Sequence, residues 1–373
     1  MNKKLNILFL IDTLGGGGAE RVLVNLVNFM DKARYNITVV SMFGGGINSQ
    51  RLMSHIKYIE RKFPHIKGLS FIFKFLPAGL LYNVFVKEKY DVIVAYMQGP
   101  STKVLAGCKN KNVVKLAWLH SDNVDKYIYQ CWFNKKNTIK AYNSFDAVCG
   151  VSNVVISSYI NEIGGKTSFV IYNTNNSEEI KKKSVENINL PFKIKNYHIA
   201  TAGRLVTAKA YDRLINVAKR LWDEGYRFDL SILGDGPQKE ELASQITKLN
   251  ADEYIHLLGF CNNPYAIMAK SDLFVSSSRW EGLSTVVTEA VILGLPVVAT
   301  DVSGTKEVLG QNNEYGIVTT NDEEGIYKGL KQMLDDKQLL SQYREKAKER
   351  APKFEPASTV AQVENLIDDL INK

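Results

Sequence analysis

Two glutamates, Glu281 and Glu289, are the first residues whose spacing could support chemistry. They lie eight positions apart, across a loop that leads into a predicted helix over 285–293. Eight helical residues make about two turns, so the two carboxylates share one side if part of the spacer is helical. Glu281 would then lie near the free N–H groups of the helix start, and Glu289 could accept hydrogen bonds from a diol. An acidic residue at an ordinary helix start gives the same pattern.

Turns rich in glycine or positive charge follow predicted strands elsewhere. Gly15–Gly18 separates an apolar run from a helical stretch, which suits a phosphate cradle but also a tight turn without a ligand. The chain has no P-loop lysine motif and no clean G-x-G-x-x-G. After Gly203, the cations Arg204 and Lys209 suit a diphosphate, although solvated surface cations would give the same pattern. Gly234–Pro237 is a similar turn, either plain or in contact with a ligand.

A histidine, His120, closes the predicted strand over 115–119. At that position it could donate a hydrogen bond to a sugar hydroxyl or stabilise developing charge, or it could be purely structural. The four cysteines, at positions 108, 131, 149 and 261, have neither metal-site spacing nor an evident disulfide pattern. Because the sequence also lacks an Asp-x-Asp triplet, we expect no required metal.

Apolar runs of strand length alternate with helical stretches, which favours parallel sheets covered by helices. Helices are expected at 211–222, 238–248 and 285–293. Strands are expected at 5–11, 36–41, 92–96, 115–119 and 147–151, and again at 198–202, 229–233, 254–258, 273–276 and 296–300.

This pattern predicts an α/β protein with two doubly wound, Rossmann-like parallel-sheet domains that face each other across a cleft. Their boundaries are expected at 1–180 and 196–355, with the lysine-rich segment 181–195 as a linker. Residues 356–373 carry apolar side chains at helical spacing and should form a closing amphipathic helix that crosses back to the first domain. Ligands in such sheets bind beyond the carboxyl ends of the strands, so the cleft is the expected site.

Composition and charge limit the classes of partner. The 373 residues are 45% hydrophobic and 23% charged, as in a soluble globular protein. The net charge is +8 but uneven: residues 1–178 carry +11 and residues 179–373 carry −3. A basic half suits an anionic partner such as a membrane surface or a phosphate-bearing acceptor. No nucleic-acid-binding motif is present, and the run 5–11 is too short for a secretory signal, so we expect a cytoplasmic protein that binds no nucleic acid.

The segment Leu69–Val86 is strongly apolar and flanked by lysines and an arginine. Its length approaches that of a membrane span, but Lys74, Pro77 and Asn83 interrupt it. We favour an interfacial helix beside anionic lipid, which would place the protein peripherally on the inner face of the cytoplasmic membrane. A buried core helix with basic ends is the alternative.

Taken together, these motifs resemble glycosyltransferase family 4, a family of retaining nucleotide-sugar transferases with the GT-B fold that act in bacterial surface polysaccharide and oligosaccharide assembly. The resemblance covers most of the chain and rests mainly on motifs in a fixed order. They are Gly203-Arg204-Leu205 with Lys209 and 212–214, Leu233–Pro237, Leu258-Gly259-Phe260, Ser271–Ser278, Glu281-Gly282-Leu283 to Glu289-Ala290, and Gly294–Thr300.

The resemblance implies that Arg204 and Lys209 bind the donor diphosphate and stabilise it as a leaving group, with Gly203 and Gly234 also in the donor site. One position departs from the family pattern. Where relatives usually have glycine after the lysine, this chain has Ala210, which would be strained if the backbone there needs a positive φ.

The remaining donor contacts are also carried over from the resemblance. Glu289 should bind the ribose hydroxyls, and backbone around Phe260 should receive the base. Glu281, with the backbone of Gly282 and Leu283, should contact the donor sugar or its distal phosphate.

In the amino-terminal half, the resemblance places Gly16, Gly17 and Gly18 against the donor phosphate and the acceptor, and His120 against the donor sugar. The expected reaction is retaining transfer of a hexose or N-acetylhexosamine from a nucleotide diphosphate sugar to a glycan hydroxyl. A UDP-sugar is the favoured donor, a lipid-linked acceptor is favoured, and no cofactor is required. Alternatives are a synthase of the same fold with a soluble acceptor, and a non-catalytic nucleotide-sugar binding protein.

Overall fold

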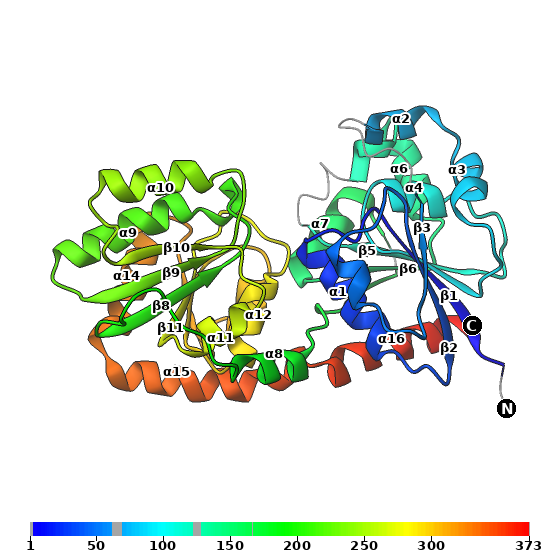
Figure 1. Ribbon diagram of the computed structural model, residues 1–373. Helices are drawn as coiled ribbons and strands as arrows, with labels where there is room; N and C mark the ends of the chain where they lie inside the picture. Colours follow the sequence, from blue (N-terminus) through cyan, green and yellow to red (C-terminus); the bar gives the residue numbers. More distant parts are fainter. Residues whose placement is uncertain (1–2, 62–68, 122–127, 166, 373) are drawn as a thin grey trace. The chain divides into compact units, whose positions relative to one another are not determined.

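The computed structural model describes residues 3–61, 69–121, 128–165 and 167–372. Contacts between Cα atoms divide the chain into two units, an amino-terminal unit of residues 1–175 with 356–373 and a carboxy-terminal unit of residues 176–355 (Figure 1). Each unit is a parallel β-sheet covered by helices. The prediction of two doubly wound parallel-sheet domains is therefore confirmed for the fold class.

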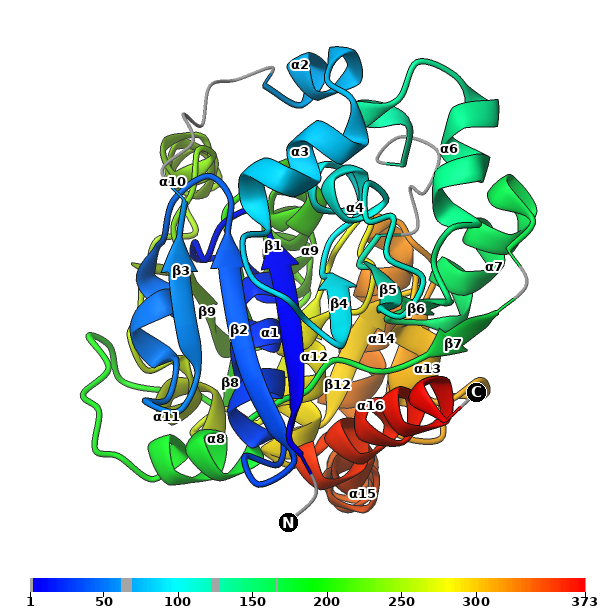
Figure 2. The same ribbon diagram turned by 90° about the vertical axis from the view of Figure 1, so that its right-hand side faces the viewer.

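The described residues of the amino-terminal unit form a seven-stranded sheet in the order β3-β2-β1-β4-β5-β6-β7, with every pair parallel. The order reverses between β1 and β4, which are hydrogen-bonded neighbours. In Figure 2, the carboxyl ends of β1 and β4 point toward α4. The strands are β1 Leu5–Ile11, β2 Tyr35–Ser41, β3 Lys57–Glu60, β4 Val92–Ala95, β5 Val114–Leu119, β6 Ala147–Gly150 and β7 Ser168–Val170.

The carboxy-terminal unit has a six-stranded parallel sheet in the order β10-β9-β8-β11-β12-β13, which reverses between β8 and β11. All six residues of β9 are buried, as expected of a parallel strand with helices on both faces. The strands are β8 Tyr197–Ala202, β9 Phe228–Leu233, β10 Ile255–Gly259, β11 Leu273–Ser276, β12 Val297–Thr300 and β13 Ile317–Thr319.

Helices cover the two sheets. In the carboxy-terminal unit, α9 contacts α10 and α14, whereas α11 and α12 both contact α8 (Figure 1). The amino-terminal unit contains α1 Gly18–Phe29, α2 Leu69–Phe75, α3 Ala78–Phe85, α4 Pro100–Leu105, α6 Lys135–Tyr142, α7 Asn153–Ile163 and α16 Pro356–Ile371, with the 3-10 turns η1 Ile47–Arg51 and η2 Tyr129–Cys131. The carboxy-terminal unit contains α8 Ser177–Ser184, α9 Tyr211–Asp223, α10 Lys239–Lys248, α11 Pro264–Ala269, α12 Thr285–Ile292, α13 Thr305–Leu309, α14 Glu323–Asp335 and α15 Lys337–Arg350, with the 3-10 turns η3 Thr207–Lys209 and η4 Ala351–Phe354.

The last helix, α16, packs against α1 of the amino-terminal unit. Arg34 pairs with Glu364 and Asp368, and the hydroxyl of Thr359 hydrogen-bonds that of Thr174 at 3.0 Å. Four of the five apolar residues of α16 that the spacing predicts to face inward, including Val363, are buried, and Leu370 is partly exposed. This helix therefore belongs to the amino-terminal unit although it comes last in the sequence.

Two segments differ from the expectation. The first part of the predicted linker 181–195 is helical, because α8 runs through Ser184. The apolar segment Leu69–Val86 is not one interfacial helix but two short ones, α2 and α3, that are interrupted at Pro77. Proline has no N–H for a helix interior, and it stands here as the N-cap of α3. Among the described helices, none combines the length and the apolar character needed to cross a bilayer.

Candidate active site

The carboxyl ends of β8 and β11 meet where the strand order of the carboxy-terminal unit reverses. Lys209, in the turn after β8, and Glu281, in the loop after β11, form an ion pair there with Nζ and Oε1 2.5 Å apart. The Ser278 hydroxyl donates to the same oxygen at 2.8 Å. Side-chain exposures of 19% and 16% show that the pair is largely shielded from water. The structure thus brings these two predicted site residues together.

Arg204 lies in the same turn but is exposed, and the described residues give its side chain no hydrogen-bond or ion-pair partner. The two cations of this turn therefore differ in whether a carboxylate neutralises them. The charge of Lys209 is already compensated by Glu281, whereas the guanidinium of Arg204 is available to an anion.

The turns after β8, β9 and β10 are joined through their backbones. Gly203 donates to the Leu233 carbonyl at 2.9 Å, and Gly234 donates to the Gly259 carbonyl at 2.8 Å. Gly234 has a φ of +144°, and a Cβ placed on it would lie 1.9 Å from the Gly203 carbonyl oxygen. Only glycine fits such a position. The side chain of Phe260, which follows, is 65% exposed at this edge.

Ala210 adopts the left-handed conformation, with φ 54° and ψ 43°, and is fully buried at the start of α9. The condition under which alanine is strained at this position is therefore met. An L-residue in this region costs roughly 1–2 kcal/mol relative to the right-handed conformation.

Glu289 lies one turn into α12 and is only 5% exposed. The Tyr265 hydroxyl of α11 donates to its Oε1 at 3.0 Å. Gly282 and Leu283 lie in the loop just before α12, and Leu283 is buried at 6% exposure. The loop runs from the end of β11 to the start of α12. Glu281 lies in this loop and Glu289 in the helix that follows it.

An arginine to which the sequence analysis gave no role, Arg213 of α9, organises this junction. Its guanidinium donates to the carbonyls of Ser277 and Ser278 and to the backbone and side chain of Asn321, at 2.5–3.0 Å. Burial lowers its pKa. A single arginine in an amphipathic helix gives no sequence signal of such a clamp.

In the amino-terminal unit, Gly16, Gly17 and Gly18 are exposed, and α1 begins at Gly18 without a side-chain cap. A Cβ on Gly17 would come within 2.2 Å of a carboxylate oxygen of Glu20. Because the N-cap residue is Gly17, no N-cap side chain bonds to the first backbone N–H groups of α1. A helix start of this kind suits an anion.

His120 follows β5, with its backbone N–H donating to the Gln98 side chain at 2.9 Å and its ring 4.9 Å from that of Tyr96. Nε2 is buried, and no described residue pairs with it. Burial, opposed by a hydrogen bond with the Tyr96 backbone, lowers the pKa of His120 to about 4. The ring is therefore neutral at pH 7 and can act as a hydrogen-bonding group.

A carboxyl group that the sequence analysis did not select also follows a strand of this sheet. Asp12 follows β1, and burial, reinforced by the charge of Glu20, raises its pKa to about 7 against a hydrogen bond from the Ser101 backbone. Its Oδ1 is buried, and no described residue hydrogen-bonds to it. Its place in the sequence, at the end of an apolar strand before a glycine turn, was the signal that could have found it.

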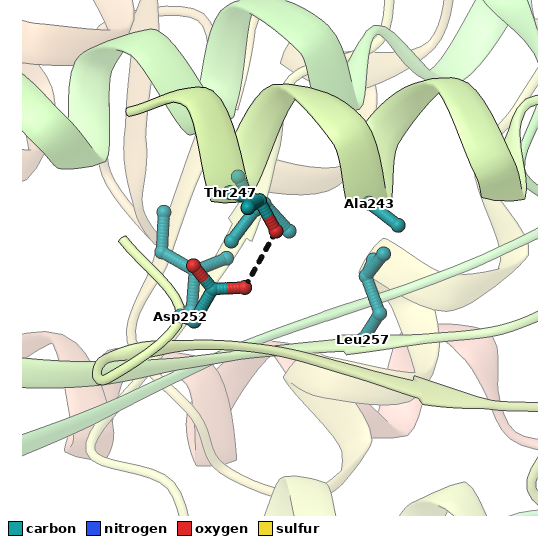
Figure 3. Close-up of a pocket in the computed structure, with 6 residues that line it drawn as sticks. Ala243, Thr247, Asp252 and Leu257 are labelled. Carbon is teal, nitrogen blue, oxygen red and sulfur yellow. Dashed lines mark hydrogen bonds between the residues drawn. The ribbon is translucent and has the colours of Figure 1, made fainter. Parts of the chain in front are cut away.

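Two further observations limit the site. No group of three or more His, Cys, Asp or Glu side chains suited to a metal occurs among the described residues. A pocket of about 170 Å³ lies between α10 and β10, where the Thr247 hydroxyl donates to Asp252 at 2.9 Å (Figure 3). It is lined mainly by apolar side chains, lies away from the strand-end turns, and is smaller than the roughly 300–1,000 Å³ of typical ligand sites.

Comparison with known proteins identifies the family. A family model described as Glycosyltransferase Family 4 matches residues 16–178, and one described as Glycosyl transferases group 1 matches residues 177–350. A Campylobacter jejuni protein named N-acetylgalactosamine-N,N'-diacetylbacillosaminyl-diphospho-undecaprenol 4-alpha-N-acetylgalactosaminyltransferase is 31% identical, over 95% of this chain and 96% of its own. The chain belongs to glycosyltransferase family 4.

Solved structures agree with the GT-B fold of this glycosyltransferase. Anabaena HepE in complex with UDP and glucose superposes with a TM-score of 0.76 at 23% identity, over 98% of this chain and 99% of that one. Sucrose-phosphate synthase from Thermosynechococcus elongatus gives 0.77 at 17% identity, over 99% and 100%. At these identities the likeness concerns the fold alone.

Proposed function

We propose that this glycosyltransferase transfers a hexose or N-acetylhexosamine from a UDP-sugar to a hydroxyl of a lipid-linked glycan, with the anomeric configuration retained. The observation that carries the proposal is the paired Lys209 and Glu281 beside an unpaired Arg204, at the strand reversal of the carboxy-terminal unit. The names of similar proteins support it. That of the Campylobacter jejuni relative specifies a diphospho-undecaprenol acceptor, and the HepE structure contains UDP and glucose.

The donor would lie against the carboxy-terminal unit. Arg204 can take two diphosphate oxygens at once, Lys209 adds a second positive charge, and glycines 203 and 234 let backbone approach closely. The buried carboxylate of Glu289 suits a ribose diol, and backbone around Phe260 would receive the base.

The donor sugar would contact Glu281 and the backbone of Gly282 and Leu283. No protein nucleophile is assigned. The departing diphosphate can itself take the proton of the acceptor hydroxyl, on the same face of the sugar from which it leaves. The work left to the protein is electrostatic stabilisation of the diphosphate, with no metal required.

The amino-terminal unit would bind the acceptor. Glycines 16, 17 and 18 would approach the donor phosphate and the acceptor, with the uncapped start of α1 directed at negative charge. A neutral His120 would hydrogen-bond the donor sugar without adding a positive charge.

We also propose that this unit rests on anionic lipid at the cytoplasmic face of the membrane. The α2–α3 region exposes large apolar side chains: Phe75 is 60%, Leu80 53% and Ile72 50% exposed. The ring of Phe75 meets that of Phe133, itself 61% exposed, at 5.2 Å. Exposed apolar groups within a basic domain suit an interfacial contact. A double substitution of Ile72 and Phe75 by serine should abolish flotation with anionic liposomes, and unchanged flotation would refute the contact.

The first experiment is a thermal-shift screen with UDP, GDP, ADP and their common sugars. A nucleotide at a hundred times its dissociation constant stabilises by roughly 2.7 kcal/mol, which gives a clear shift. A shift with UDP supports the proposed donor, a shift with GDP alone would redirect it, and no shift would refute the site.

The second experiment measures turnover as UDP release from UDP-N-acetylgalactosamine, UDP-N-acetylglucosamine, UDP-glucose and UDP-galactose. The acceptor probes are N-acetylgalactosamine-N,N'-diacetylbacillosaminyl-diphospho-undecaprenol and p-nitrophenyl glycosides. Lys209→Met should lower turnover by an amount equivalent to about 2–4 kcal/mol of barrier, by analogy with loss of an oxyanion donor. Lys219→Met is the matched control, since Lys219 also pairs with a carboxylate but lies on the exposed side of α9. Near-full turnover by Lys209→Met would disprove its role, and an inverted product configuration would disprove retention.

A further inference from the structure

The amino-terminal unit has a carboxyl group with one buried oxygen where its own strand order reverses. Asp12 directly follows β1, and β1 lies between β2 and β4. In open parallel sheets, ligands bind beyond the carboxyl ends of the strands at this reversal. Asp12 therefore has the topological position in its sheet that Gly203 has in the other sheet, yet the proposed donor site does not use it.

The carboxyl group of Asp12 is only partly satisfied. The backbone N–H of Ser101 donates to it, but Oδ1 is buried and has no hydrogen-bond partner in the described part of the chain. The titratable groups that act on it are Glu20 of α1, whose charge opposes its ionisation, and the thiol of Cys131 in η2. Buried polar atoms in folded proteins nearly always have a partner, so an unpaired one directs attention to an absent ligand.

Two more unpaired polar atoms belong to the same unit. His120 follows β5, on the other side of β4 from Asp12, and its Nε2 is buried without a described partner. The Nε1 of Trp132, next in sequence to Cys131, is buried in the same condition. Gln98 lies between the two strand ends and accepts the His120 backbone N–H.

The chemistry of these atoms matches that of a sugar. The Asp12 oxygen can accept a hydrogen bond, the Trp132 N–H can only donate one, and a neutral imidazole can do either. Sugar hydroxyls both donate and accept. A phosphate group is a poor direct partner for the Asp12 carboxyl group, because the ionised Asp12 and Glu20 would repel it.

We propose that the Asp12 carboxylate accepts a hydrogen bond from a hydroxyl of the acceptor's terminal, uncharged sugar and so positions that sugar for transfer. This inference rests on the proposed function and adds to it a residue that acts on the acceptor and leaves donor binding unaffected.

A pH dependence follows from this role. The pKa of Asp12 is raised to about 7, so its carboxylate form, the better hydrogen-bond acceptor, becomes dominant as the pH rises through neutrality. Acceptor-dependent kcat/KM should therefore increase with pH, with a midpoint near 7. His120 cannot produce this rise, because its pKa is lowered to about 4.

The test compares Asp12→Asn, Asp12→Glu and the control Asp146→Asn in the full chain. The side chain of Asp146 is exposed at the opposite, amino-terminal edge of the same sheet and accepts the Lys115 N–H. The acceptor is the probe that the wild-type enzyme uses in the transfer assay. Thermal stabilisation by UDP is measured in parallel for every variant.

Asp12→Asn should lower acceptor kcat/KM by about 10–100-fold, mainly through KM, as expected for loss of a hydrogen bond to a charged group. The rise with pH should disappear, Asp12→Glu should recover part of the activity, and the UDP shift should remain. Wild-type acceptor kinetics in Asp12→Asn, or a pH rise that persists in it, would overturn the inference. Loss of the UDP shift in Asp12→Asn would equally overturn it, because the residue would then act through the donor or the fold. Absence of the UDP shift in the wild-type protein would instead refute the proposed function.

Discussion

Replacing Arg213 by methionine tests how the loop between β11 and α12 is held. The guanidinium is 6% exposed and donates to Ser277 O through both Nε and Nη2, at 3.0 and 2.6 Å. Methionine has a similar length and no donor, so Ser277 O would lose both of these bonds. The Ser278 carbonyl would still accept from Thr300 at 2.6 Å, and Asn321 is exposed and can turn to water.

The magnitude follows from counting these losses. One buried carbonyl left unsatisfied costs about 1–3 kcal/mol, and hydrogen bonds to charged groups contribute about 1.5–3 kcal/mol each. Burial lowers the pKa of Arg213, which shows that the buried charge itself is unfavourable. Its removal therefore offsets part of the loss. We expect a net loss of about 3 kcal/mol for the carboxy-terminal unit. Arg213→Lys should lose less, because lysine keeps a donor, but it should still lose stability because an ammonium cannot bind the carbonyls as a fork.

Urea unfolding of the full chain measures the free energy, and hydrogen exchange of residues 277–281 assigns it to this loop. Arg220→Met, on the same helix, is the matched control, because Arg220 is exposed and pairs with Glu224 and Glu324 at the surface. UDP affinity should fall only in Arg213→Met, since Ser277 donates to the Lys209 carbonyl and Ser278 to Glu281. A stability loss in Arg213→Met no larger than that of the control would refute the reasoning.

Three other predictions concern stability, each measured by urea unfolding. Gly234→Ala should cost more than about 2 kcal/mol, because its Cβ would collide with the Gly203 carbonyl, whereas Gly225→Ala has open space and should cost only about 1 kcal/mol for its positive φ. Burial lowers the pKa of His198, so below pH 6.5 the unfolded chain takes the proton first; stability should fall as the pH drops from 7 to 5, and His198→Gln should reduce that fall. The raised pKa of Asp12 has the opposite sign: the folded state holds the extra proton between pH 3.8 and about 7. Asp12→Asn should therefore stabilise the protein more at pH 8 than at pH 5, and an equal effect at both would contradict the shift.

The strands that the sequence predicted are those with continuous apolar runs. In β1 the apolar segment is long and both faces of the sheet are covered, so hydrophobicity locates it. In β9 the apolar residues still predominate, although Asp229 and Ser231 are buried within it. The missed strands are short or edge elements. β3 and β7 lie at the two edges of their sheet, and β13, at an edge of the other, has three residues. In β3, Lys57 and Glu60 are exposed, so half of its pattern resembles a loop.

The turns proposed for the donor site could be selected from the sequence because glycines and cations directly after apolar strands are typical of turns that bind phosphate groups. What could not be predicted is which of these residues meet. Lys209 and Glu281 are 72 positions apart, and their contact depends on the adjacency of β8 and β11, two strands that are not consecutive in sequence. Asp12 was missed for a related reason. Its place after an apolar strand and before a glycine turn was visible in the sequence, but its altered pKa arises from burial together with Glu20 and the Ser101 backbone, which only the fold brings to it.

The ion pair changes how the donor site should be understood. Two free cations would bind a diphosphate strongly in the ground state, which lowers KM without raising kcat. Glu281 instead compensates Lys209, so in the absence of donor the pair is close to neutral and only Arg204 carries an unpaired charge. As the bond to the sugar breaks, negative charge grows on the departing diphosphate, and the attraction of Lys209 for it grows relative to that for Glu281. If Lys209 binds the departing diphosphate as proposed, holding the lysine in place by a competing carboxylate would favour the transition state over the bound substrate, which is the condition for catalysis.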